Sequence, residues 1–158
     1  MVDRRDIGSW LEGPGSRSGD PSAYPGERLG MPRGGVGSLG RFGRRLLGVV
    51  IDWTVCQLIA FAFFRVPLPF TDVATGRDTA ILLGLFALEN LLLVGTVGAT
   101  LGHRVVGLRV HSTDGRTPRP FQTLVRTVLL CAFIPAMFWD RDGRGLHDKA
   151  AGTVIVRT

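Results

Sequence analysis

The sequence of 158 residues predicts a small, mainly α-helical integral membrane protein, and three observations support this fold class. The mean hydropathy is positive at +0.22, and charged residues make up 20% of the chain, below the roughly 25% of soluble proteins. The apolar residues are gathered in two long runs, residues 46–64 and 80–100. Arginines stand beside these runs, as at the ends of transmembrane helices.

The first 40 residues have a different composition and are expected to form a disordered cytoplasmic tail. Between residues 8 and 40, 19 of 33 residues are Gly, Pro or Ser. Such a segment buries too little apolar surface to offset the entropy of ordering it. Residues 41–158 are then the membrane domain.

The two apolar runs predict a transmembrane helical hairpin. The first run has 19 residues, which span about 28 Å as an α-helix and match a bilayer core of roughly 30 Å. We expect helices over residues 44–64 and 79–101, joined by a loop that contains Pro67 and Pro69. Two helices with a short connection pack antiparallel.

Arginine placement predicts that both ends of this hairpin face the cytoplasm. Basic residues near the helix ends set orientation, with the richer side inside. The loop between the helices contains only two of them, Arg65 and Arg77. The flanking segments contain more: Arg41, Arg44, Arg45, Arg104, Arg109, Arg116 and Arg119.

A third apolar stretch, residues 121–139, leaves two topologies open. It is long enough to span, but it contains Gln122, Arg126 and Pro135. Residues 105–111 and 153–157 are rich in Val and predict two short strands, which can pair only on one side of the membrane. We therefore favour an interfacial or re-entrant third helix and a cytoplasmic β-hairpin of 105–111 with 153–157. The alternative is a third full span.

Two carboxylates, Asp52 and Glu89, fall inside the predicted spans and need partners there. Asp52 follows Arg45 by seven residues, nearly two helical turns, so Arg45 is its expected partner. For Glu89 the expected partners are Asn90 and Arg126. Two interpretations stay open: a buried polar network that fixes helix packing, or a proton or cation pathway.

Small residues near the end of the second helix predict close helix contact. Gly95 with Ala99, and Gly98 with Gly102, have the small-xxx-small spacing that lets two helices approach, within the hairpin or between protomers.

Several function classes find no support in the sequence. No nucleophile elbow, phosphate-binding glycine loop or metal-ligand spacing is present, so we expect no enzyme activity, cofactor or metal. The basic residues flank apolar spans without interleaved aromatics, which argues against nucleic acid. Anionic lipid headgroups are the partner that such arginines favour.

Three segments in order resemble the RDD family of bacterial membrane proteins: RRLLGVVID (44–52), LGHRVVGLRV (101–110) and GLHDKAAGTVIV (145–156). The resemblance implies that Arg45, Asp52 and Asp148 are the arginine and two aspartates of the family name. It also matches Glu89 to an acidic residue of the second helix. His103 departs from the family, which often has Lys there.

The resemblance implies a multi-pass protein of the bacterial cytoplasmic membrane, with the N-terminus inside. With a cytoplasmic C-terminus, we expect Arg45 to lie between Asp52 and Asp148 and to join the two hairpins. The predicted role is a scaffold or accessory subunit, with a protein partner or a homo-oligomer. The alternative is a proton- or cation-coupled transport component that works as an oligomer through Asp52 and Glu89, since some relatives are proposed to transport ions.

Overall fold

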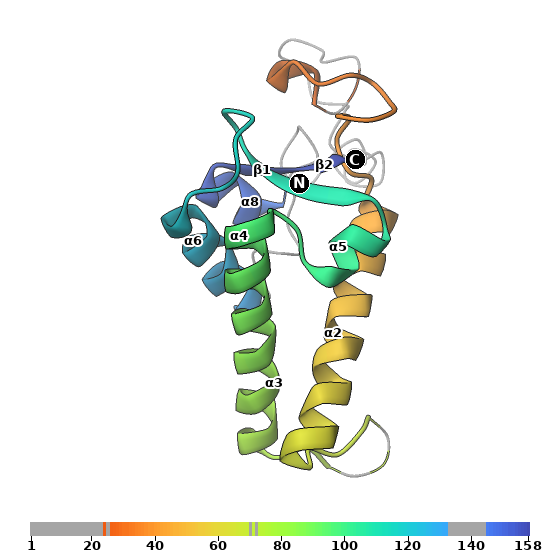
Figure 1. Ribbon diagram of the computed structural model, residues 1–158, viewed down its shortest axis with the longest axis vertical. Coiled ribbons are helices and arrows are strands. Elements are labelled where there is room, and N and C mark those ends of the chain that lie inside the picture. The colour runs from red at the N-terminus through yellow and green to blue at the C-terminus, as the bar shows by residue number, and fades with distance from the viewer. Residues whose placement is uncertain (1–23, 25, 70, 72, 133–144) are drawn as a thin grey trace, which may run out of the picture.

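The computed structural model describes residues 24, 26–69, 71, 73–132 and 145–158 (Figure 1). The elements in chain order are η1 (Glu27–Leu29), α2 (Phe42–Phe64), α3 (Gly76–Glu89), the π-helical η2 (Asn90–Val94), α4 (Gly95–Val97), α5 (Leu101–Val105), β1 (Leu108–Ser112), α6 (Pro120–Cys131), α8 (Leu146–Ala151) and β2 (Thr153–Arg157). The fold is mainly helical with one small sheet. We call α5, β1, α8 and β2 the cap.

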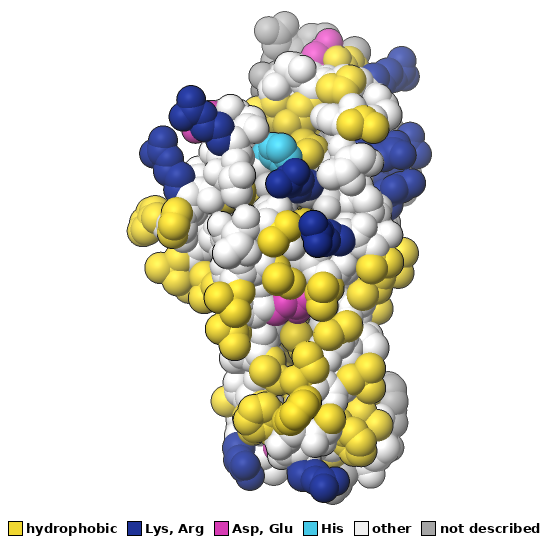
Figure 2. All heavy atoms as spheres, viewed as in Figure 1, with side chains coloured by type: hydrophobic (Ala, Val, Ile, Leu, Met, Phe, Trp, Pro, Cys, Tyr) yellow, Lys and Arg dark blue, Asp and Glu magenta, His cyan; other side chains and the backbone are white. Residues whose placement is uncertain are grey.

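Two long helical segments form the predicted hairpin and lie side by side below the cap (Figure 1). Phe42–Phe64 and Gly76–Val97 are each long and apolar enough to cross a membrane. Only 28% and 22% of their most apolar windows are buried within the chain, so most apolar side chains face outward. Figure 2 shows hydrophobic side chains along the two helices and basic side chains toward both ends.

The second helix differs from the prediction at both ends. It begins at Gly76 because Thr75 and Asp78 form a capping box, three residues before the expected start at 79. It ends at Val97 because Gly98 adopts a left-handed conformation with φ +76°. Thr100 then caps the separate short helix α5, so the predicted helix 79–101 is wrong at its C-terminal end.

The predicted strand pairing is confirmed. β1 and β2 are antiparallel, and Val110 pairs with Ile155. The first strand begins at Leu108, not at 105, because Val105 ends α5 and Gly107 turns the chain with φ +66°. The sheet contains buried apolar residues and lies at the hairpin end that also holds the start of α2 (Figure 1).

The last residues of the predicted disordered tail are ordered against the sheet. The amides of Gly37 and Gly40 donate to the carbonyls of Arg157 and Ile155, each at 2.8 Å. A Cβ on Gly40 would lie 2.9 Å from Leu108 Cδ2, so a glycine is needed for this approach. The prediction of disorder is therefore wrong for residues 37–40, while residues 1–23 lie outside the described part.

The third apolar stretch contains the amphipathic helix α6. Its 12 residues correspond to about 18 Å, shorter than a bilayer core. Phe121, Leu124 and Val128 are exposed, whereas Arg126 is buried. The remainder of the predicted third helix, residues 133–139, lies outside the described residues.

Candidate functional site

Asp148 is the centre of a buried ion cluster between the cap and the hairpin. Its carboxylate is fully buried in the first turn of α8. Arg126 Nε lies 2.7 Å from Oδ1, and Arg45 Nη1 lies 3.9 Å from Oδ2. His147 Nε2 is 3.4 Å from Oδ2, and Thr153 Oγ1 donates to Oδ1 at 3.1 Å. These contacts join α2, α6, α8 and β2.

The charges around Asp148 keep it ionised. Burial alone would raise the pKa of this carboxyl group, but Arg126, His147 and Arg45 hold it well below its usual value. Arg126 is itself 1% exposed, so each ion would be costly without the other. The pair is therefore a fixed junction between α6 and α8.

Arg126 extends the cluster to the second long helix. Its Nη1 donates to Asn90 Oδ1 at 3.4 Å, and Asn90 Nδ2 donates to the Phe86 carbonyl at 3.0 Å. Asn90 opens the π-helical turn η2. The expectation that Arg126 and Asn90 are partners of Glu89 is wrong. Arg126 binds both Asn90 and Asp148 instead.

Asp52 has different partners from those expected. Its Oδ2 accepts from Thr100 Oγ1 and its Oδ1 accepts from the Gly102 amide, both at 2.5 Å. A carboxylate at a helix N-terminus satisfies amides that have no partner within the helix. Among the described residues no ion pair joins Asp52 to Arg45, so the predicted pairing is wrong.

His103 links the two carboxylate centres. Its Nδ1 lies 2.6 Å from Thr100 Oγ1, whose single proton is already donated to Asp52. His103 Nδ1 is therefore the donor in this hydrogen bond. The charges of Arg126 and Asp148 act on the same ring. Sequence reasoning noticed His103 only as a departure from the family.

Lowering the pH is expected to destabilise the protein through His103. Burial first, and then the charge of Arg126, lower the pKa of His103 from 6.5 to about 3, against a smaller opposing effect of Asp148. Below pH 6.5, His103 binds a proton in the unfolded chain but stays neutral in the folded chain. Stability is therefore full above pH 6.5 and falls toward pH 3, by about 1.4 kcal/mol per pH unit.

Thermal unfolding in detergent at pH 7.5 and pH 5.5 measures this loss. Between these two pH values the variant His103→Asn should lose less stability than the wild type does, and His111→Asn, altered on strand β1, should lose as much as the wild type. The low pKa of Asp148 contributes only below its ordinary value of 3.8, where its stabilisation is lost as pH falls. An unchanged slope in His103→Asn would contradict the assignment.

Glu89 lies against the first helix rather than against α6. Cys56 Sγ donates to its Oε2 at 3.4 Å, and the Leu101 amide donates to its Oε1 at 3.4 Å. The two carboxyl groups picked out from the sequence thus accept from the neighbouring amides of Leu101 and Gly102, at the start of α5.

The small residues divide into different roles. A Cβ on Gly95 would meet no atom within 4 Å, so Gly95 makes no close helix contact within the hairpin, and Gly98 is a left-handed helix end. Contact between protomers through these residues stays a prediction. Ala99 is buried in the connection between α4 and α5. Gly102 alone makes a close helix contact, and its partner is Gly48 of α2.

The residues that sequence reasoning missed are Thr100 and His147. Each is buried and binds one family aspartate, but a lone Thr or His has no pattern that marks such a role. Arg126 had a visible mark, because an arginine inside an apolar run needs a partner. Within the described residues no group of three or more His, Cys, Asp or Glu could hold a metal ion.

Comparison with known proteins gives a family match over most of the chain. The family model described as the RDD family matches residues 39–152, which include Arg45, Asp52 and Asp148. Comparisons with curated proteins and with solved structures found no match. The matched region contains both apolar helices, which together with the family indicate a membrane protein. The chain belongs to the RDD family.

Proposed function

We propose that this protein is a non-enzymatic scaffold or accessory subunit of a larger assembly in the bacterial cytoplasmic membrane. The observation that supports this role is that Arg45, Asp52 and Asp148 all make contacts inside the chain. These contacts fix the cap on the hairpin, and they leave the outer faces of the two helices to lipid and partner helices.

The proposed topology has two spans and both ends in the cytoplasm. Support comes from the position of β2 at the same end as the start of α2 (Figure 1), and from the arginines near that end. A reporter active only in the cytoplasm, fused after Thr158, should be active. Activity of an external reporter at the same position would exclude this topology.

The scaffold role predicts a defined partner on the exposed helix faces. A photo-crosslinking residue at Leu92, which is 55% exposed, should give one discrete protein adduct in native membranes. The same residue at Leu82, which is 7% exposed, is the matched control and should give none. If the exposed positions of both long helices yield lipid adducts alone, the scaffold role is wrong.

A second candidate is a proton-coupled transport component, and the placement of Asp52 and Glu89 on neighbouring amides of α5 favours it. Carboxyl groups inside membrane-spanning segments are common in proton relays. Glu89→Gln is the sharper variant, because Asp52→Asn would also disturb α5. In proteoliposomes a transporter should lose proton flux on this substitution; unchanged flux would exclude the relay.

A further inference from the structure

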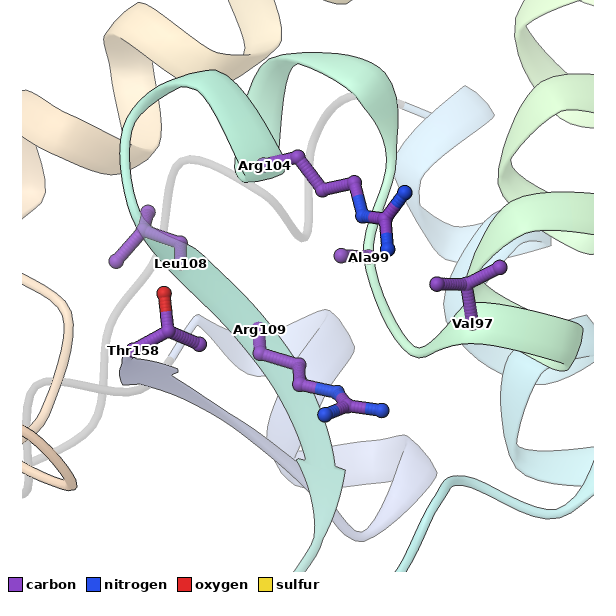
Figure 3. A pocket seen from close by; sticks show the side chains of 6 residues that line it. All are labelled: Val97, Ala99, Arg104, Leu108, Arg109 and Thr158. Atoms are coloured by element: carbon purple, nitrogen blue, oxygen red, sulfur yellow. The ribbon is translucent and has the colours of Figure 1, made fainter.

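An open hollow beside the cap is lined by two arginines and four uncharged residues. It has a volume of about 300 Å³ and is lined by Val97, Ala99, Arg104, Leu108, Arg109 and Thr158 (Figure 3). Arg104 comes from α5 and Arg109 from β1, and Gly107 makes the turn between these elements. Figure 3 shows both guanidinium groups on the same side of this hollow.

The backbone holds the hollow in shape. The Val110 amide donates to the Gly98 carbonyl at 2.7 Å, which fastens β1 to the end of the second long helix. A Cβ on Gly98 would lie 3.2 Å from Arg109 Nε, so the absent side chain gives Arg109 room to lie along the backbone. Thr158 adds a hydroxyl group at the far wall.

The side chains of Arg104 and Arg109 have no polar partner among the described residues. Neither side chain forms an ion pair or a hydrogen bond with any described residue. Arg45 and Arg126, by contrast, face Asp148, and Arg44 donates to the Val106 carbonyl. Two adjacent guanidinium groups without a counter-charge favour an anion with several oxygens, such as a phosphate.

In the proposed two-span topology, the hollow would lie at the depth of the lipid phosphates. Val97 is the last residue of the second apolar segment, so the hollow begins where the apolar surface ends. On α5 the neighbouring Leu101 and Val105 are 45% and 73% exposed, which suits contact with acyl chains. Apolar side chains beside unpaired arginines suit a lipid. Its acyl chain would contact Leu101 and Val105, and its phosphate would contact the arginines.

We propose that Arg104 and Arg109 form a binding site for the phosphate of one anionic diacyl phospholipid. The site does not depend on the scaffold role, because it uses neither Asp148 nor the outer faces of the long helices. Its chemistry is a phosphodiester held by two guanidinium groups at the rim of the cap. The lipid would fasten the cap to the membrane surface.

Native mass spectrometry of the full chain in micelles with equal amounts of phosphatidylcholine and phosphatidylglycerol tests the site. The wild type should retain phosphatidylglycerol in preference. The double variant Arg104→Gln/Arg109→Gln should bind it about 25-fold more weakly, since each arginine near a membrane surface contributes about fivefold. Both side chains are exposed, so this variant should melt like wild type.

Arg33→Gln/Arg116→Gln is the matched control, with the same change of charge at two exposed arginines outside the hollow. It should retain the lipid. If both double variants lost phosphatidylglycerol equally, the effect would come from overall charge, and the proposed site would be wrong. The site would also be wrong if Arg104→Gln/Arg109→Gln bound the lipid as tightly as the wild type. Excess inorganic phosphate should leave the lipid bound; its displacement by phosphate alone would overturn the lipid as occupant.

Discussion

Replacing Arg126 with methionine is expected to lower the free energy of unfolding by about 3–5 kcal/mol, the usual effect of breaking a buried ion pair. Methionine keeps the length and apolar character of the side chain but removes its charge. Asp148 would then be a fully buried carboxylate, and among the described Lys and Arg side chains its remaining ion-pair partner would be Arg45 at 3.9 Å. Asn90 would also lose the donor at its Oδ1.

A double-mutant cycle separates the ion pair from simple loss of packing. Asp148→Asn alone should also destabilise, because Arg126 would be buried without its counter-charge. The combined variant Arg126→Met/Asp148→Asn should be more stable than the sum of the two single effects predicts, with a coupling of about 1–3 kcal/mol. Thermal unfolding of detergent-solubilised protein, followed by circular dichroism, gives all three values.

Arg116→Met is the control for this cycle. Arg116 is exposed in the turn after β1, and its loss should change stability by less than about 0.5 kcal/mol. If Arg126→Met has the same melting temperature as Arg116→Met, the ion cluster does not stabilise the attachment of the cap to the hairpin. If the two effects at Arg126 and Asp148 simply add, the two side chains are not coupled.

Gly102→Ala is the second substitution with a large expected effect, about 3 kcal/mol or more, because the new methyl group would overlap backbone. A Cβ on Gly102 would clash with the carbonyl oxygen of Gly48 and would lie 2.9 Å from Asp52 Cγ. The backbone of α2 cannot move aside as a side chain can. Helix α5 would have to shift, and the Gly102 amide would leave Asp52.

Gly48→Ala is a matched control from the other side of the same contact. A Cβ on Gly48 would lie 3.5 Å from the nearest atom of Gly102, an ordinary van der Waals distance. Alanine is also the better helix former by about 1 kcal/mol. Its expected effect is therefore neutral or slightly stabilising. Equal melting temperatures of the two alanine variants would show that the helices do not meet at Gly102.

The apolar runs and the strand pattern could be predicted from local sequence. Hydrophobicity over twenty residues depends on composition alone, so the hairpin of α2 and α3 could be anticipated along with its approximate ends. The pairing of β1 with β2 followed from two Val-rich segments that need each other. The break at Gly98 could not be anticipated, because a glycine inside an apolar run also suits a continuous helix.

The sequence by itself determined that Asp52 and Glu89 are exceptional, because charge in an apolar run is costly wherever the chain folds, and the family resemblance added Arg45 and Asp148. Only the tertiary structure decided their partners. Asp52 binds Thr100 and the start of α5, and Asp148 binds Arg126. The physical reason is that local spacing limits which residues can share a helix face, whereas ion pairs between α6 and α8 depend on how separate elements pack.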